Sequence, residues 1–412
     1  MFDSGSTGFM LVCTSLVMLM TPGLAFFYGG LASKRNILGI MVQSFVSLGW
    51  TTILWFVMGY SLCFSGSMAD GTDFAGIIGN LDKAFLNGIT HNSPFAGNGK
   101  IPEYVFVAFQ MMFAIITPAL ITGAFVNRIT FKAYFIFLTV WQILVYYPFC
   151  HMVWGGGILA EWGVIDFAGG IVVHATAGFA ALASVIFVGA RTNKNSTPNS
   201  IPLVAIGSGL LYFGWYGFNA GSELQVDGIT ANAFINTDVA ASFALITWMV
   251  IEWSREKKPK LVGILTGSIA GLATITPCAG FVPLWAAPII GIFAGAGCYI
   301  AVLWKNKQQW DDALDVWGVH GIGGVIGTIL LGVFASLSVN PAGNDGLIYG
   351  NTTFFLKELA AITLASVYGF VFTYLILWLI NKITPVRVSE QDEIDGIDMA
   401  LHGERAYDEG CL

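Results

Sequence analysis

The chain has 412 residues, of which 56% are apolar and only 10% are charged, and its mean hydropathy is +0.73. A soluble globular protein carries roughly 25% charged residues, so this composition excludes that class and predicts an all-α, polytopic membrane protein. No nucleic-acid partner is expected for a chain whose formal net charge is −7.

Eleven predominantly apolar stretches are long enough to cross a hydrocarbon core about 30 Å thick, which takes about 20 helical residues. The eleven predicted spans cover residues 6–32, 37–65, 103–124, 131–150, 166–190, 199–221, 231–253, 259–279, 281–304, 312–337 and 352–383. Only the segment 278–283 separates the eighth span from the ninth. Residues 66–102 are polar and rich in Gly and Asn, which predicts an ordered external loop.

The distribution of Lys and Arg predicts the orientation, because these residues gather in short loops on the inner side of a membrane. With the N-terminus outside, 15 of the 18 basic residues fall on the inner side. They are Lys34, Arg35, Arg128, Lys132, Arg191, Lys194, Arg255, Lys257, Lys258, Lys260, Lys305, Lys307, Lys382, Arg387 and Arg405. We therefore predict a multi-pass protein of the cell membrane with an external N-terminus, no cleaved signal peptide and a cytoplasmic C-terminus.

Residues 1–383 form the predicted transmembrane domain, and residues 384–412 form a cytoplasmic tail with eight acidic and two basic side chains. Such a tail is either a solvated segment that keeps the inner rim charged or a docking and regulatory segment. The six cysteines are scattered without metal-ligand spacing, which favours packing roles over disulfides or metal sites. They are Cys13, Cys63, Cys150, Cys278, Cys298 and Cys411.

Two histidines lie deep inside apolar stretches, and each follows an aspartate by eight residues: Asp166 precedes His174, and Asp312 precedes His320. An ionisable side chain within a membrane span is costly, so each histidine is a candidate functional residue. Each aspartate can cap the start of its helix, and eight residues at a rise of 1.5 Å place each histidine about 12 Å from that start.

The two Asp–His pairs also predict an internal repeat. A second match joins 116–118 in the third span to 275–277 in the eighth, since both read Ile-Thr-Pro. Spans 1–5 and 6–10 are then two copies of one plan, and the odd number five requires the second copy to be inverted in the membrane. Depths of about 12 Å from opposite faces of a core about 30 Å thick bring both imidazoles close to its centre.

Neutral imidazoles are expected there, because burial disfavours the charged form of histidine. Paired neutral rings can pass a proton or present polar atoms to a small neutral solute. The alternative is two unrelated core histidines, each bonded to a backbone carbonyl. A metal site needs three or four convergent ligands and only two are found, so no metal or other cofactor is expected.

Aromatic residues gather near the external ends of several predicted spans. Phe109 and Phe113 share one helix face, Trp154 precedes three glycines, and Phe218 lies one turn before Ser222. Aromatic faces attract cations and a serine hydroxyl accepts an N–H, so together these residues suit a small cation with N–H donors. For each aromatic residue taken alone, core packing or a place in an interfacial belt is the alternative.

At these residues the chain resembles the ammonium transporter family (Amt/Mep/Rh), and the Amt branch in particular. The matching strings are HMVWGGG at 151–157, DFAGGIVVH at 166–174, FGWYGFNAGS at 213–222 and VWGVHGIGG at 316–324. The resemblance implies eleven helices, a homotrimer in the lipid bilayer with one hydrophobic pore per subunit, and a transporter rather than an enzyme.

The resemblance also implies roles for the matched residues. These are the external recruitment site (Trp154, Phe113, Ser222 and, nearby, Phe109), the stacked phenyl gate (Phe113, Phe218) and the pore with its twin histidines (Trp215, His174, His320). Asp166 matches an aspartate that holds the external site in shape, and Asp312 is its counterpart in the second copy. Residues 393–398 and 404–407 resemble a segment that couples subunits, on a face where PII-type signalling proteins bind.

The resulting hypothesis is that NH4+ binds outside, loses a proton, and crosses as NH3 past the histidine pair, with net charge transfer. One rival is a passive channel for NH3 or another small neutral solute. Another is an ammonium sensor that signals through the tail.

Overall fold

The structure is a computed structural model that describes residues 2–192 and 197–407. Lys194 and the last five residues of the tail, which include Cys411, lie outside the described residues. The five remaining cysteines are buried free thiols, which agrees with packing roles. Within the described ranges, regular structure is helical apart from three isolated β-bridges.

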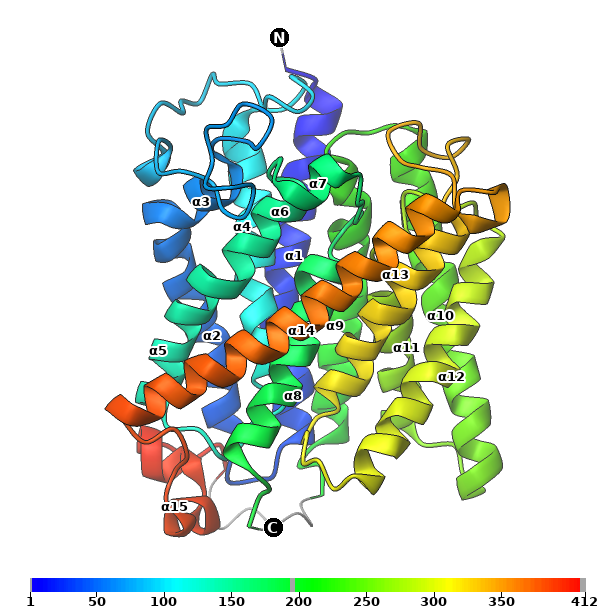
Figure 1. Ribbon diagram of the computed structural model, residues 1–412. Helices are drawn as coiled ribbons and strands as arrows, with labels where there is room; N and C mark the ends of the chain where they lie inside the picture. The colour runs from blue at the N-terminus through cyan, green and yellow to red at the C-terminus, as the bar shows by residue number, and fades with distance from the viewer. Residues whose placement is uncertain (1, 193–196, 408–412) are drawn as a thin grey trace.

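Fifteen α-helices follow one another along the described chain (Figure 1). They are α1 (Ser4–Leu31), α2 (Ile37–Leu54), α3 (Tyr60–Phe64), α4 (Glu103–Ile121), α5 (Phe131–Trp141), α6 (Tyr147–Trp154), α7 (Ile158–Trp162), α8 (Thr176–Val188), α9 (Ile201–Ala220), α10 (Gly228–Glu256), α11 (Leu261–Ile275), α12 (Ala286–Lys307), α13 (Ile322–Phe334), α14 (Thr352–Ile383) and α15 (Glu390–Asp395).

Shorter helices continue or connect these elements. The π-helices are η1 (Trp55–Gly59), η3 (Gln142–Tyr146), η4 (Gly170–Ala175), η6 (Trp317–Gly321) and η8 (Asp398–His402), and the 3-10 turns are η2 (Ala84–Leu86), η5 (Gly221–Glu223) and η7 (Leu347–Tyr349). The segments η1, η3, η4 and η6 each run directly into an α-helix, so they are parts of longer helical runs.

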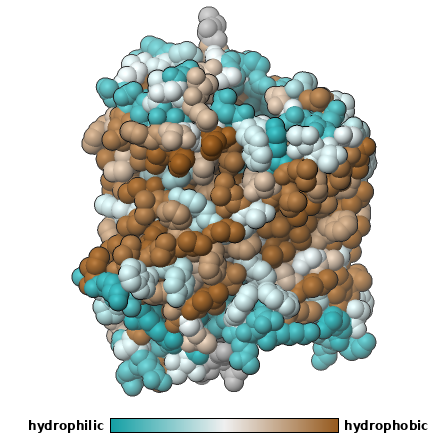
Figure 2. Space-filling view, in the orientation of Figure 1, coloured by the Kyte–Doolittle hydropathy of each residue, from teal (hydrophilic) through white to brown (hydrophobic). Residues whose placement is uncertain are grey.

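Ten helical runs among the described residues are long and apolar enough to cross a membrane, so the chain is a multi-pass membrane protein. Figure 2 shows an apolar band around the middle of the molecule between two hydrophilic ends. The predicted eighth span, 259–279, corresponds to α11, which has 15 residues and is shorter than the other ten. The count of eleven spans and their orientation stay predictions.

Some predicted boundaries were wrong. The fourth span, given as 131–150, extends through α5, η3 and α6 to Trp154, so Trp154 ends a helix instead of lying in a separate external segment. The fifth span, given from residue 166, begins as a helix only at Gly170. Between the eighth and ninth spans the break is wider than expected, from Ile275 to Ala286.

Close helix contacts depend on glycine at a few positions. Gly207 of α9 lies so near α1 that a Cβ there would stand 2.2 Å from the Phe27 nitrogen. Helix α14 has 32 residues and crosses the outside of the bundle obliquely, packing on α5, α8 and α13 (Figure 1). Small residues at such contacts let backbones approach in a bilayer, where van der Waals packing drives helix association.

The tail folds back onto the end of the bundle opposite the start of α1 (Figure 1). The Asp398 carboxylate accepts the Ile37 and Gly39 N–H groups at the start of α2, at 3.0 and 2.9 Å. Arg387 pairs with Glu393 at 2.8 Å. The described part of the tail is therefore packed against the bundle.

Candidate functional site

A cavity of about 350 Å³, called the external cavity here after the predicted orientation, opens at the end of the bundle where α4 starts and α6 and α9 end. Phe113, Trp154 and Ser222 all line it, so the structure brings together three of the residues predicted for the recruitment site. Phe109 is not among the lining residues. It is fully buried and contacts the Phe113 ring edge-on, with ring centroids 5.0 Å apart.

The Trp154 indole is fixed by its ring N–H, which donates to the Asp166 carbonyl oxygen at 2.8 Å. Its ring stands perpendicular to Phe113, with centroids 5.9 Å apart. The turn that follows needs glycine, because a Cβ at Gly155 would lie 1.9 Å from the Cys63 carbonyl oxygen. Since the N–H is already occupied, the aromatic face is what this side chain offers a cation.

Ser222 lies just beyond the end of α9, in the turn η5. Its hydroxyl donates to the Phe218 carbonyl at 2.8 Å, as the four-residue spacing favours. The hydroxyl oxygen keeps lone pairs that can accept an N–H from a bound solute.

Phe113 and Phe218 stack below this cavity, with ring centroids 4.2 Å apart and an interplanar angle of 28°. Each is only 1% exposed. Phe113 lines the external cavity and Phe218 lines the next cavity inward, so the stacked pair separates the two spaces.

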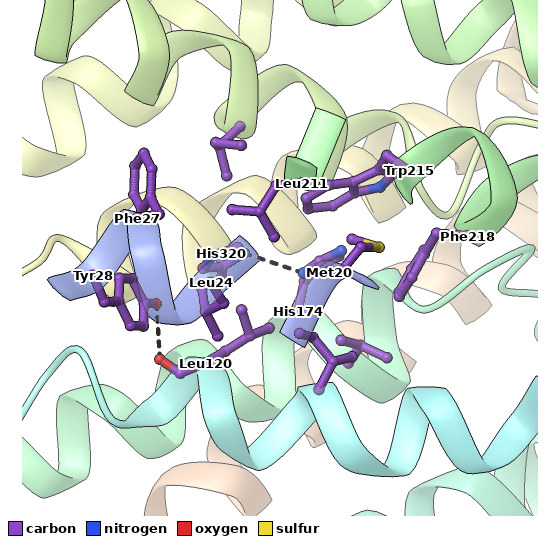
Figure 3. Close-up of a pocket in the computed structure, with 13 residues that line it drawn as sticks. Met20, Leu24, Phe27, Tyr28, Leu120, His174, Leu211, Trp215, Phe218 and His320 are labelled. Carbon is purple, nitrogen blue, oxygen red and sulfur yellow. Dashed lines mark hydrogen bonds between the residues drawn. The ribbon is translucent and has the colours of Figure 1, made fainter. Parts of the chain in front are cut away.

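The inner cavity has a volume of about 20 Å³ and is mostly apolar (Figure 3). Its apolar lining includes Met20, Leu24, Ile116, Leu120, Leu211 and Ile269. About 10–15 Å³ suffices for one water molecule, so the space holds one small molecule and excludes a hydrated ion.

His174 and His320 meet in this cavity with their Nδ1 atoms 3.2 Å apart. The rings are nearly parallel, at 12°, and their centroids are 5.2 Å apart. Figure 3 places His174 on the side of Trp215 and Phe218, and His320 on the side of Phe27 and Tyr28.

A hydrogen bond between two neutral rings requires one Nδ1 to donate and the other to accept. The donating ring then carries a bare Nε2, and the accepting ring carries an Nε2–H. His174 Nε2 has no hydrogen-bond partner within the described part of the chain. The pair therefore combines a donor and an acceptor and keeps at least one nitrogen available to a solute.

Each histidine lies in a π-helical segment, His174 in η4 and His320 in η6. Apolar periodicity does not reveal this feature, although π-helical turns occur frequently at functional sites. Asp166 anchors η4, because its two oxygens accept the N–H groups of residues 169–172 at 2.8 to 3.1 Å. The predicted helix cap is thus present.

Asp312 caps η6 less completely. Its Oδ2 accepts the Trp317 N–H at 2.8 Å, and its Oδ1 has no partner among the residues that the structure describes. The two aspartates have matched places in the chain but unequal surroundings.

Trp215 lines the inner cavity and stacks on His174, with centroids 5.6 Å apart and an angle of 17°. Its ring N–H donates to the Thr276 hydroxyl at 2.9 Å. Thr276 was not among the predicted site residues, although the repeated Ile-Thr-Pro string had already marked its position.

A third cavity, of about 150 Å³, continues toward the end where the tail lies. It shares Phe27, Tyr28, Ile269 and His320 with the inner cavity, so the two spaces adjoin. Arg191 lines this cavity and forms an ion pair with Asp311 at 2.7 Å. Three cavities thus follow one another past both histidines, with the stacked phenyl pair between the first and the second.

No three His, Cys, Asp or Glu side chains within residues 2–192 and 197–407 lie close enough to hold a metal ion. The polar groups on the path suit hydrogen bonding to a small solute.

Comparison with known proteins gives a consistent result. Residues 8–407 match the sequence profile of the Ammonium Transporter Family. The chain is 44% identical over 405 residues to the ammonium transporter of Bacillus subtilis, covering 98% of each, and 43% identical over 412 residues to that of Aquifex aeolicus, covering 98% and 94%. The crystal structure of Saccharomyces cerevisiae Mep2 superimposes with a TM-score of 0.88 at 34% identity, covering 94% of this chain and 88% of that one.

These relatives are transporters, and the matches span nearly the whole chain. The chain that encloses these cavities therefore belongs to the Ammonium Transporter Family.

Proposed function

We propose that the protein binds NH4+ in the external cavity, removes a proton, and conducts NH3 through the inner cavity along the histidine pair. One observation carries the proposal: a stacked phenyl pair separates an aromatic cavity of about 350 Å³ from an apolar one of about 20 Å³ that holds two hydrogen-bonded imidazoles.

The external cavity supports binding of the cationic form. The faces of Trp154 and Phe113 attract a cation, most strongly after it has lost water. The Ser222 oxygen accepts one of its N–H groups. Ammonium has four N–H donors, whereas K+ has the same charge but none. A hydrogen bond to the Ser222 oxygen therefore favours ammonium over K+.

The inner cavity supports passage of the neutral form. Moving an unpaired ion from water into apolar surroundings costs several kcal/mol even after the protein relaxes around it. A single cation–π contact contributes about 2 kcal/mol when it is desolvated, so it does not offset this cost. Burial therefore favours NH3 over NH4+ inside. The stacked Phe113 and Phe218 rings must part for each molecule, which keeps bulk water out.

The histidine pair supports both guidance and proton transfer. NH3 accepts a hydrogen bond from a ring N–H and donates to a bare ring nitrogen, and the pair offers both. We propose that the proton taken from NH4+ passes separately along His174 and His320 to the inner side, where it rejoins NH3, so that uptake carries net charge.

Currents in proteoliposomes test this mechanism, with and without a pH gradient. Wild type should give a current pulse on addition of ammonium. The His174→Ala, His320→Ala double variant should abolish it, and His91→Ala, a change at an exposed external histidine, should not. Pulses of wild-type size in the double variant would refute the relay.

Trp154→Leu separates the transporter from a passive channel. A channel for NH3 or another neutral solute needs no cation site, so flux in that variant would stay at the wild-type level. Under our proposal the variant needs a higher ammonium concentration for half-maximal flux. Uptake by the purified protein without a partner would exclude a role as a sensor alone.

We further propose a homotrimer with residues 384–412 as its regulatory tail and a PII-type signalling protein as a partner at that face. The docking of Asp398 on α2 supports the regulatory role, because a partner that moves the tail would act directly on a membrane helix. Native mass spectrometry should give the mass of three chains. A single-chain mass in detergents that keep transport intact would contradict the trimer.

A further inference from the structure

Besides Asp166 and Asn340, two polar side chains outside the recruitment site line the external cavity. They are Glu223, which follows Ser222 in the turn η5, and Gln110, which follows Phe109 in α4. Neither belongs to the recruitment residues proposed above, yet both bring acceptor oxygens into a space that receives a cation.

Glu223 is half-buried, and its Oε1 accepts an N–H from the Gln225 side chain at 3.0 Å. The same amide donates to Asp227 at 2.7 Å, so one neutral group bridges two carboxylates. The nearby Lys100 ammonium donates to the Gln225 oxygen at 2.6 Å. Among the residues that the structure describes, Glu223 takes part in no ion pair, and Asp227 places a second carboxyl group close by.

Gln110 is 8% exposed, and its Oε1 has no hydrogen-bond partner among the described side chains and backbone. Leaving a buried amide oxygen unpaired is unfavourable, and most such atoms in proteins have a partner. An N–H donor that enters the cavity would satisfy this oxygen. The atom therefore indicates a ligand with N–H groups independently of the charge on Glu223.

We infer that Glu223 and Gln110 form an outer ammonium-binding position in the cavity, ahead of the aromatic site at Trp154. The carboxylate attracts the cation while it still holds water, because charge attraction acts over several ångströms. The Gln110 oxygen then replaces a water molecule as the cation moves inward. This inference rests on the proposed function, which supplies the cation.

The Glu223 carboxylate with the Gln110 amide oxygen and the Ser222 hydroxyl suits a monovalent cation, because the other carboxylate that lines the cavity, Asp166, already accepts four backbone N–H groups. Divalent ions prefer six or more oxygen ligands, often from several carboxylates, and this cavity does not offer such a set. The position therefore raises the local concentration of ammonium without trapping it.

Saturable ammonium uptake in proteoliposomes tests the outer position. Glu223→Gln removes the charge and keeps an oxygen that can accept the Gln225 N–H. It should raise the half-saturation concentration roughly 3- to 10-fold, the range expected for one partly buried charge-assisted contact, and leave the maximal rate unchanged. The dependence of half-saturation on ionic strength should also weaken, since salt screens the carboxylate.

Glu161→Gln is the matched control, because Glu161 is an exposed carboxylate in α7 that does not line this cavity. It should leave half-saturation and its salt dependence at wild-type values. Gln110→Met keeps the side-chain volume but removes the oxygen, and it should raise half-saturation without changing the salt dependence. Thermal unfolding of each variant separates a binding defect from misfolding.

The outcomes distinguish this inference from the proposed function. If Trp154→Leu impairs uptake while Glu223→Gln behaves like Glu161→Gln, the outer position is wrong and the recruitment site stands. If wild type shows no saturable uptake, both are wrong. A raised half-saturation in Glu223→Gln and Gln110→Met, with both variants folded, supports the inference.

Discussion

The contact between α8 and η6 gives a sharp test of how the histidine pair is held. Gly178 lies against Gly321, the residue after His320, and a Cβ on Gly178 would stand 2.1 Å from the Gly321 Cα. Ordinary van der Waals contact begins at 3.4 Å, so the two backbones must separate by about 1.3 Å in Gly178→Ala. Backbone cannot rotate aside as a flexible side chain can.

The expected cost follows from two opposing effects. Overpacking of this kind costs about 1–3 kcal/mol, whereas Gly→Ala inside a helix returns about 1 kcal/mol of helix propensity. A net loss of roughly 0–2 kcal/mol relative to wild type remains. A shift near 1 Å at His320 also breaks the 3.2 Å contact with His174, and displacement of that size lowers the rate about tenfold or more.

Thermal unfolding in detergent and ammonium uptake in proteoliposomes measure the two effects. Gly209→Ala is the control, because a Cβ at that exposed position of α9 meets nothing within 4 Å. The control should be as stable as wild type or slightly more stable, with normal uptake. If Gly178→Ala matches it in both assays, the close backbone contact does not position His320.

Three further predictions concern the acidic residues. Asp166→Asn should destabilise the protein more than Asp312→Asn, by about 2 kcal/mol or more in thermal unfolding, because it disturbs four N–H contacts instead of one; equal losses would contradict this. Burial raises the pKa of the Asp73 carboxyl, but hydrogen bonds from His151 and the Gly76 N–H outweigh it and keep the pKa below the ordinary 3.8. The stability from this contact is present above about pH 4 and is lost as pH falls through the lowered pKa, so hydrogen exchange of the external loop should rise on acidification, and Asp73→Asn should remove that rise. Asp398→Ala should cost about 1 kcal/mol through loss of the cap on α2 and increase proteolysis of the tail, whereas an unchanged cleavage pattern would argue against docking through this residue.

The sequence was sufficient to predict the histidine pair and its capping aspartates. Polar residues in apolar stretches are rare enough that the matched eight-residue spacings stood out, and opposed helix starts brought His174 and His320 together. Spacing predicted a shared helix face for Phe109 and Phe113, whereas the roles of Phe113, Trp154 and Phe218 came from the resemblance to the ammonium transporter family.

Other features depend on three-dimensional detail that no spacing contains. The π-helical turns at both histidines change which backbone groups pair, while the apolar pattern stays the same. Phe109 and Phe113 share a helix face, yet Phe109 packs against Gly221 and does not line the external cavity. The unequal capping by Asp166 and Asp312 likewise arises from local backbone, which the repeat alone would have made identical.

The small volume of the inner cavity, about 20 Å³, has a consequence for the membrane potential. A space for one small molecule cannot hold an unbroken file of water, so ions and free protons have no continuous liquid route across the bilayer at this point. Under the proposed mechanism, the only charge that crosses at this point is the one that accompanies each ammonium taken up.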